Sequence, residues 1–348
     1  MALRALLASL LAAVVATPAS LAASADPAPA EPVLLSELAF TARAHVGDPL
    51  RLYSVLSTGL GFRELPTGRH RPTGTVLGGG STLLFGCRPG GLCVYDEVTG
   101  RVRALGIRCG SGCGVVQGYA GFASRAFLVV TTGEPVARLL VMQPDGSERR
   151  VLLRTRDRLS RPSVEAWRGE EIAVVATGRR QRLLVVPTDG PGARTLASFR
   201  RAAPFGPTYG PSWYTESRGT PHVLLHARVA GRLRVVSVDP DGTQHVLATG
   251  LYPGGPHAGE LMDGSPGLSF GYLRDGAVIW HGPRDEEVAI ARDPVGPTAW
   301  FDHSFIVTVV RGQRLVLTYG SGPEKGGTLA GPFARVVDVA RWGGSPDT

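Results

Sequence analysis

The chain has 348 residues, of which 43% are hydrophobic and 7% aromatic, and this hydrophobic content excludes a disordered chain. Its 47 glycines and 27 prolines favour many short strands joined by tight turns. The net charge of +8 comes from arginine, because Lys325 is the only lysine. The arginines are scattered, with short clusters at Arg149-Arg150, Arg179-Arg180 and Arg200-Arg201, which favours a composition bias over a polyanion-binding surface. No nucleic-acid partner is expected.

The first 25 residues have the pattern of a secretory signal peptide. Arg4 precedes an apolar run from Ala5 to Ala16 that is too short to span a bilayer. Ala23-Ser24-Ala25 is the small-x-small sequence of a cleavage site, with a cut after Ala22 as the competing position. No later stretch is long and apolar enough to cross a membrane. We therefore expect a mature protein that is secreted or otherwise extracytoplasmic.

Residues 26–32 form a short Pro/Ala linker, residues 33–342 carry strand-like runs, and residues 343–348 are expected to be a disordered tail. Helical periodicity is nearly absent after the linker. The strand-like runs are rich in Val, Leu, Ile and Phe and are bounded by tight turns. They are Leu52–Leu56, Leu83–Phe85, Phe127–Thr131, Leu139–Met142, Ile172–Ala176, Leu183–Val186, Val223–His226, Leu233–Val238, Phe305–Val310 and Leu315–Thr318.

Two markers recur along the chain with the same interval. Turns that end in glycine, several of them Asp-Gly, suit the positive φ of a hairpin. Their glycines are Gly100, Gly146, Gly190, Gly242, Gly282 and Gly320. An X-Pro pair before a strand-rich stretch occurs at Pro72, Pro162, Pro211, Pro256, Pro297 and Pro332. A shared period of about 40–50 residues predicts an all-β protein with a β-propeller fold, whereas the alternative β-sandwich would not produce the period.

The two ends of the chain supply the parts of one further blade. Six complete repeats fit between Pro72 and Gly331, the segment 333–340 offers one more strand, and residues 33–68 offer three. We predict a seven-bladed ring in which 333–340 forms the innermost strand of a blade whose outer strands come from 33–68. This arrangement, in which the C-terminal strand joins the N-terminal strands, removes the exposed apolar faces of an open ring.

At these markers the chain resembles the TolB-type (WD40-like) β-propeller repeat. The most similar copy reads Gly210-Pro211-Ser212-Trp213-Tyr214, followed by Val223–His226 and then Val238-Asp239-Pro240-Asp241-Gly242. A second copy covers 161–165 and 171–175. The likeness spans most of residues 72–331, although the first Pro-Asp-Gly turn of that family's blade is missing throughout. The resemblance implies binding or scaffolding, or a gating domain beside a peptidase, and it implies no catalytic residues.

The four cysteines lie between residues 87 and 113. Cys87 and Cys93 flank a five-residue loop that places them opposite each other on a hairpin, and Cys109 and Cys113 enclose Gly110-Ser111-Gly112. We expect two disulfides, paired 87–93 and 109–113, because an exported chain meets an oxidising environment. A four-thiolate zinc site is the alternative, but the spacing of Cys87 and Cys93 does not suit it.

One polar group is the candidate ligand-binding site. In a propeller, equivalent loops converge on one face around the central channel, where His and carboxylates can bind a metal or act as acid and base. Ordinary solvated turns, with aromatic side chains packed between blades, are the other explanation. The candidates are Trp213, Tyr214, His257, Glu260, Asp263, Trp300, Asp302 and His303.

The sequence thus predicts a secreted, monomeric propeller that binds a protein, glycan or small-molecule ligand at one face. No Gly-x-Ser-x-Gly elbow, Walker loop or dinucleotide fingerprint is present, and no cofactor is indicated. The alternative is a propeller-fold hydrolase or lyase, with or without a metal ion, that uses the His and carboxylate loops at the channel mouth. A structural protein of the cell envelope is a third hypothesis.

Overall fold

The computed structural model describes residues 37–79, 82–89, 91–109, 112–120, 125–133, 135–164, 170–190, 192–203, 209–215, 220–252, 257–260, 266–282, 284–292, 294–302, 305–310, 313–319 and 322–342. These residues belong to one compact unit that extends from Leu35 to Thr348. Its regular elements are all β-strands, and among the described residues no helix is long and apolar enough to cross a membrane.

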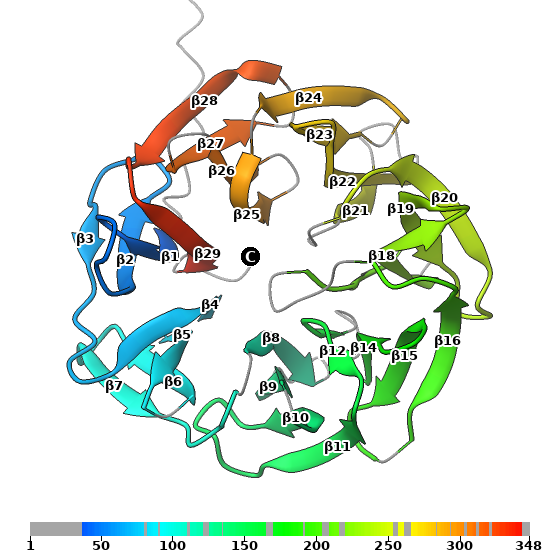
Figure 1. Ribbon diagram of the computed structural model, residues 1–348, viewed down its shortest axis with the longest axis horizontal. Coiled ribbons are helices and arrows are strands. Elements are labelled where there is room, and N and C mark those ends of the chain that lie inside the picture. The colour runs from blue at the N-terminus through cyan, green and yellow to red at the C-terminus, as the bar shows by residue number, and fades with distance from the viewer. Residues whose placement is uncertain are drawn as a thin grey trace, which may run out of the picture. The chain divides into compact units, whose positions relative to one another are not determined.

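The strands form seven small antiparallel sheets arranged as the blades of a β-propeller, which confirms the predicted fold class (Figure 1). From the centre outwards, blade 1 consists of β29 (Arg335–Trp342), β1 (Glu37–Arg43), β2 (Arg51–Leu56) and β3 (Arg63–Glu64). Blade 2 consists of β4 (Arg71–Gly79), β5 (Thr82–Arg88), β6 (Gly91–Asp96) and β7 (Arg101–Ala104). Blade 3 consists of β8 (Cys113–Ala120), β9 (Arg125–Thr132), β10 (Ala137–Met142) and β11 (Arg150–Thr155).

Blade 4 has an inner edge made of two short strands, β12 (Arg158–Leu159) and β13 (Ser163–Val164), followed by β14 (Glu171–Thr177), β15 (Gln181–Pro187) and β16 (Arg194–Phe199). Blade 5 consists of β17 (Ser212–Thr215), β18 (Pro221–Val229), β19 (Arg232–Val238) and β20 (Gln244–Thr249). Blade 6 consists of β21 (His257–Glu260), β22 (Pro266–Arg274), β23 (Ala277–His281) and β24 (Glu287–Arg292). Blade 7 consists of β25 (Pro294–Asp302), β26 (Phe305–Val310), β27 (Arg314–Tyr319) and β28 (Gly322–Ala330).

The hydrophobic core lies mainly between neighbouring blades. Leu84 of blade 2, for example, shares a buried cluster with Leu128 and Val130 of blade 3. The apolar runs of the sequence all fall in second and third strands, which are covered on both faces by neighbouring blades. The outermost strand β7 alternates exposed arginines with half-buried Val102 and Ala104, so that it buries only one face.

The chain ends close the ring as the sequence predicts. β29 pairs antiparallel with β1, from Glu37 opposite Trp342 to Arg43 opposite Arg335. Trp342 is fully buried in a cluster with blade 2, and Val339 is buried in a cluster with blade 7. The first and last strands of the described chain therefore share one blade that packs on both neighbours.

Arginine side chains tie the outer rims of blades 2, 3 and 4 together. Arg103 of β7 donates to the carbonyl oxygen of Asp145 in blade 3 at 2.7 Å. Arg150 of β11 donates to the carbonyl oxygens of Thr188 and Asp189 in blade 4, at 2.9 and 3.0 Å. In both cases the outer strand of one blade holds the Asp-Gly turn of the next, so some of the arginine content has a structural use.

In blade 5 the glycine of the corresponding Asp-Gly turn, Gly242, is required by packing as well as by backbone conformation. Gly242 has φ +90°, and a Cβ there would lie 2.7 Å from the carbonyl oxygen of Leu196 in the preceding blade. A side chain would therefore push blades 4 and 5 apart. Gly242 thus marks a place where one blade touches the outer strand of the blade before it, whereas a Cβ on Gly100 or Gly190 would meet no atom within 4 Å.

Both expected disulfides are present. Cys87–Cys93 connects β5 and β6 across their hairpin, and Cys109–Cys113 lies in the connection that leads into β8. All four cysteines are paired, so the alternative four-thiolate zinc site has no thiolate left to form it.

Candidate functional site

The innermost strands all begin at the same face of the ring, because each is entered from the outermost strand of the preceding blade. Two X-Pro pairs of the sequence lie just before innermost strands, Gly210-Pro211 before β17 and Gly331-Pro332 before β29. We call this side the entry face. In Figure 1 the innermost strands β4, β8, β25 and β29 lie nearest the centre of the ring.

A pocket of about 370 Å³ opens between blades 1 and 7 and the connection from blade 4 to blade 5 at this face. We call it the entry pocket. Its wall comes from the start of β25, the start of β29, the turn between β26 and β27, and the connection from blade 4 to blade 5. The lining residues are Tyr209, Gly296, Pro297, Gln313, Ala334, Arg335, Val336 and Val337.

Gln313 anchors the entry pocket to the closing strand. Its side-chain oxygen accepts a hydrogen bond from the backbone N–H of Val336 at 2.8 Å, and its carbonyl oxygen accepts one from Phe333 at 3.1 Å. These bonds hold the start of β29 against blade 7. The side-chain oxygen is therefore occupied by the protein, while the amide nitrogen remains a donor for another group.

Arg335 and Tyr209 supply the other polar groups of the entry pocket. Arg335 is exposed, and none of the ion pairs among the described residues involves it. Tyr209 places its ring edge-on to His226, with 6.1 Å between the ring centroids. Burial raises the pKa of the Tyr209 phenol, so the hydroxyl stays neutral and able to donate at physiological pH. The entry pocket thus offers three donor groups.

Arg161 lies where the inner edge of blade 4 is interrupted, between β12 and β13. Its side chain donates to the carbonyl oxygen of Val115 in blade 3 at 3.1 Å. A Cβ on Gly114 would lie 2.6 Å from the Cα of Arg161, and one on Gly210 would lie 2.3 Å from its carbonyl oxygen. Arg161 therefore lies wedged between blades 3 and 5, which is possible only because both neighbours are glycines.

Asp338 of β29 is the acidic group nearest in sequence to the entry pocket, and the backbone already engages it. Its carboxylate accepts hydrogen bonds from the N–H groups of Val76, at 2.8 Å, and Val339, at 2.9 Å. Burial raises the pKa of Asp338, and the positive charge of Arg161 and these hydrogen bonds offset part of the effect. The carboxyl group therefore joins blades 1 and 2 and does not neutralise the donors of the entry pocket.

Trp213 and Tyr214, two of the predicted site residues, lie in β17 and pack into the blades. The Tyr214 hydroxyl is 2.7 Å from the hydroxyl oxygen of Ser237, and its ring stacks on His222 with 5.1 Å between centroids. Trp213 is half buried against the apolar cluster between blades 4 and 5. Neither residue is among those that line the entry pocket.

The other predicted site residues lie on innermost strands or outside the described residues. His257 and Glu260 are the first and last residues of β21, and Trp300 and Asp302 lie near the end of β25. These are strands of the channel wall, where the sequence had suggested loops. The side chains of these four residues, and Asp263 and His303 altogether, lie outside what the structure describes. Their role as a site stays a prediction.

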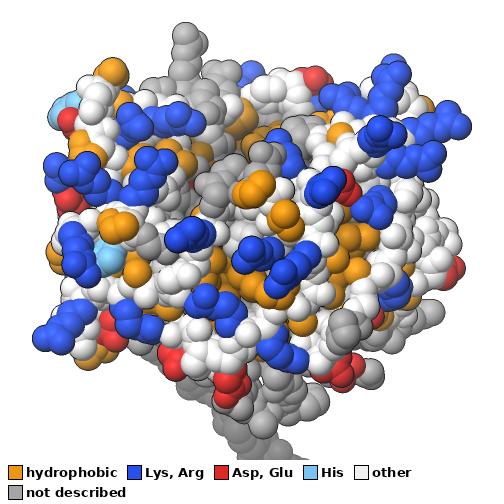
Figure 2. All heavy atoms as spheres, turned by 60° about the horizontal axis from the view of Figure 1, so that its bottom comes forward, with side chains coloured by type: hydrophobic (Ala, Val, Ile, Leu, Met, Phe, Trp, Pro, Cys, Tyr) orange, Lys and Arg blue, Asp and Glu red, His pale blue; other side chains and the backbone are white. Residues whose placement is uncertain are grey.

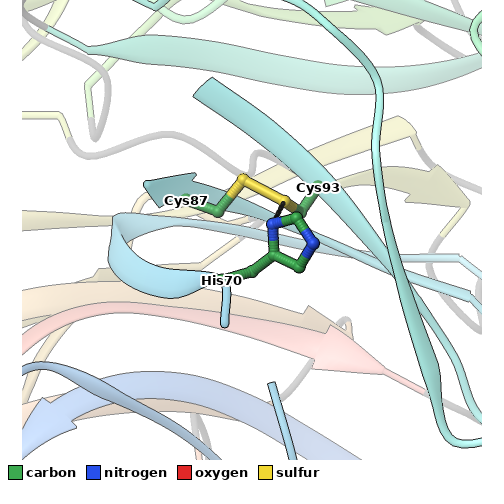
Figure 3. A group of neighbouring side chains, drawn as sticks. All are labelled: His70, Cys87 and Cys93. Atoms are coloured by element: carbon green, nitrogen blue, oxygen red, sulfur yellow. Dashed lines mark hydrogen bonds between the residues drawn. A yellow bond between two sulfur atoms is a disulfide. The ribbon is translucent and has the colours of Figure 1, made fainter. Parts of the chain in front are cut away.

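His70 lies against the Cys87–Cys93 disulfide (Figure 3). Its Nδ1 atom is 3.5 Å from the sulfur of Cys93 and 3.3 Å from the carbonyl oxygen of Pro89. The three side chains are buried, and their potential ligand atoms all lie within 4.8 Å of one another. Because the two sulfur atoms are bonded to each other, this group does not present the thiolates that a metal ion would need.

The fold is similar to that of several solved structures. A puromycin hydrolase matches with a TM-score of 0.56 and 14% identity, over 87% of this chain and 52% of that one. An oligogalacturonate lyase in complex with manganese matches with a TM-score of 0.51 and 14% identity, over 78% of this chain and 83% of that one. TolB from Acinetobacter baumannii matches with a TM-score of 0.30 and 12% identity, over 78% of this chain and 82% of that one.

These likenesses show the propeller fold alone. The chain spans about half of the puromycin hydrolase, and the score against TolB is too low to support membership of a TolB-type family. No protein-family model matches the chain, and no relative was found among curated sequences. The function therefore has to be argued from the chain's own residues.

Proposed function

We propose that the protein is an extracytoplasmic binding module whose entry pocket holds a small acidic ligand. The observation that carries the proposal is the meeting of three donor groups, from Tyr209, Gln313 and Arg335, in a pocket whose described lining has no acidic residue. Two disulfides support a location outside the reducing cytoplasm.

The size and chemistry of the entry pocket suit one compact ligand. Its volume of about 370 Å³ falls in the range of roughly 300–1,000 Å³ that is usual for small-molecule sites. A guanidinium forms charge-assisted, two-pronged hydrogen bonds with a carboxylate, and the amide and phenol add neutral donors. A ligand with one carboxylate and further acceptor oxygens, such as a sugar acid, complements this set.

The test compares a hexuronic acid with the corresponding neutral hexose by calorimetric titration. We expect only the acid to bind and Arg335→Gln to weaken its affinity by about tenfold or more, because a hydrogen bond to a charged group contributes about 1.5–3 kcal/mol. Arg314→Gln is the matched control, since Arg314 is exposed, lies one residue from Gln313 and is not part of the lining. Equal losses in the two variants, or no binding of any small carboxylate, would contradict the proposal.

A metal-dependent lyase or hydrolase is the second candidate, and the placement of two acidic residues favours it. When Gly255-Pro256 is aligned with Gly296-Pro297, Glu260 corresponds to Phe301, next to Asp302. Their strands, β21 and β25, are the innermost strands of neighbouring blades, so the two residues lie at the same end of the channel wall.

Manganese titration of the secreted protein tests this candidate. Stoichiometric binding that is lost in Asp302→Asn and in Glu260→Gln, with the free energy of unfolding of each variant within about 0.5 kcal/mol of the parent's, would favour an enzyme site. Absence of divalent-ion binding would remove it.

A further inference from the structure

A second recess lies away from the entry pocket, between the outer strand of blade 4 and blade 5. It is a groove of about 610 Å³ in which Arg200 and Arg201 follow β16 and Arg228 belongs to β18. Phe199 and Val229 add apolar surface, and Gln244 completes the polar part of the wall. None of the described residues that line the groove is acidic.

The positive charge of the groove is concentrated and unbalanced. Arg201 and Arg228 face each other directly in an isolated antiparallel bridge, and like charges in that position destabilise a sheet. All three arginines are exposed, and none takes part in an ion pair or side-chain hydrogen bond among the described residues.

Two other arginines of blade 4, Arg182 and Arg194, do form ion pairs with acidic side chains. Arg182 is 2.7 Å from a carboxylate oxygen of Asp157, and Arg194 is 3.3 Å from one of Glu171. The charge of the groove is therefore not a general property of this blade. Figure 2 shows basic side chains over much of one face of the molecule, with acidic side chains mainly toward its edge, in keeping with the net charge of +8.

We propose that this groove binds an acidic polysaccharide, a chain of sugars that carry carboxylate or sulfate groups. Arginine forks pair with carboxylate and sulfate oxygens, and the apolar surface of Val229 and Ala230 suits the C–H face of a sugar ring. Single-stranded nucleic acid fits less well, because it needs exposed aromatic rings for base stacking and the one aromatic side chain of the groove, Phe199, is only 5% exposed. Among the described residues the groove and the entry pocket share none of their lining, so the proposal stands independently of the proposed function.

The experiment measures binding of four probes to the full-length secreted protein: an oligomer of galacturonic acid, dextran sulfate, neutral dextran and single-stranded DNA of matched charge. The test variant is Arg201→Gln/Arg228→Gln. The control variant is Arg138→Gln/Arg154→Gln, because Arg138 and Arg154 are also exposed and directly opposed across two strands, in blade 3, but do not line the groove. Both variants lower the net charge by the same amount.

We expect at least one acidic glycan to bind and neutral dextran not to bind. The test variant should lose about tenfold in affinity for each arginine removed, while the control loses less than about twofold. Arg201→Lys/Arg228→Lys, which retains the charge but not the fork, should lie between them. A melting curve for each variant checks that it is folded.

Three results would overturn the proposal. The parent protein binds neither acidic glycan, the test and control variants lose affinity equally, or the DNA binds as tightly as the glycans and with the same dependence on Arg201 and Arg228.

Discussion

The rim that joins blades 2, 3 and 4 and the groove between blades 4 and 5 use the same residue in opposite ways. At the rim, Arg103 and Arg150 donate to backbone carbonyl oxygens of the next blade. In the groove, Arg200, Arg201 and Arg228 have no such partners among the described residues. A guanidinium that is hydrogen-bonded to the backbone contributes to stability. A guanidinium that faces solvent and other arginines is available to a ligand.

This difference shows that arginine content alone does not separate structure from function. Arg149-Arg150 and Arg200-Arg201 are the same dipeptide in the sequence, each beside an outer strand. Arg149 and Arg150 both reach carbonyl oxygens of neighbouring blades. The two pairs differ in whether a neighbouring blade brings backbone carbonyl oxygens within hydrogen-bonding distance of the guanidinium groups.

The pairing of β29 with β1 closes the ring, and we expect this closure to contribute more to stability than the arginines at the rim. Deletion of residues 332–348 removes β29 and with it Val336, Val339 and Trp342, each 3% exposed or less. Burial of such a side chain contributes about 1.5–3 kcal/mol, so the loss should exceed about 5 kcal/mol and lead to aggregation. Thermal melting and size-exclusion chromatography measure it. A truncated protein that melts like the full-length chain would show that closure does not depend on this strand.

Blades 1 and 2 are joined by a carboxylate, that of Asp338, and not by an arginine. Asp338 accepts the backbone N–H of Val76. Asp338→Ala leaves that buried donor without a partner, so we expect a loss of about 1–3 kcal/mol in the free energy of unfolding. Chemical denaturation measures the loss. A change below about 0.5 kcal/mol would mean that water replaces the carboxylate.

Asp338→Asn sharpens this case through its pH dependence. The pKa of Asp338 is raised in the folded protein from its ordinary value of 3.8. A raised carboxyl pKa stabilises the fold at low pH, and that contribution is lost as the pH rises through the folded value. The melting temperature of the Asn variant, relative to the parent, should therefore increase from pH 4 to pH 7. A constant or decreasing difference would contradict the assigned direction.

Arg150→Ala tests the rim directly. It removes two hydrogen bonds to blade 4, and we expect a loss of about 1 kcal/mol. Arg154→Ala is the matched control, because Arg154 lies in the same strand, is also exposed and has no partner in blade 4 among the described residues; it should change stability by less than about 0.5 kcal/mol. If chemical denaturation gives the same loss for Arg150→Ala and Arg154→Ala, the hydrogen bonds of Arg150 to blade 4 do not contribute measurably to stability.

The sequence was sufficient for the parts of the fold that repeat or that are local. The turn glycines predicted the repeated blades because a tight hairpin turn favours the positive φ that Gly100, Gly146 and Gly242 adopt. The cysteine spacing predicted both disulfides because a short loop leaves few pairings. The inner and outer strands were harder to predict, since β7 alternates arginine with smaller side chains and β4 contains Gly74, Gly78 and Gly79, so that neither is an apolar run.

The entry pocket could not be found in the same way. Tyr209, Gln313 and Arg335 are separated by more than 20 residues along the chain and meet only because the ring closes. No periodic signal encodes that meeting. Arg161 was visible as part of an X-Pro marker, but its position between Gly114 and Gly210 depends on contacts with two other blades. Two of the eight positions that the sequence singled out, Trp213 and Tyr214, were conspicuous because they are aromatic, and they pack between blades.

The smallest expected effect separates charge repulsion from ligand binding. Arg201 and Arg228 oppose each other in blades 4 and 5, and Arg138 and Arg154 oppose each other in blade 3. Replacing either pair with glutamine should raise the free energy of unfolding by about 0.5 kcal/mol at low ionic strength, because cross-strand like charges repel. The gain should vanish near 1 M salt, where the screening length is only about 3 Å. Chemical denaturation at both salt concentrations measures it.

If the two pairs behave alike in stability and only the Arg201/Arg228 variant loses glycan affinity, the groove is distinguished by its shape and not by its charge alone. A loss of stability at Arg201 and Arg228 would mean instead that these arginines, like Arg150, are structural ties.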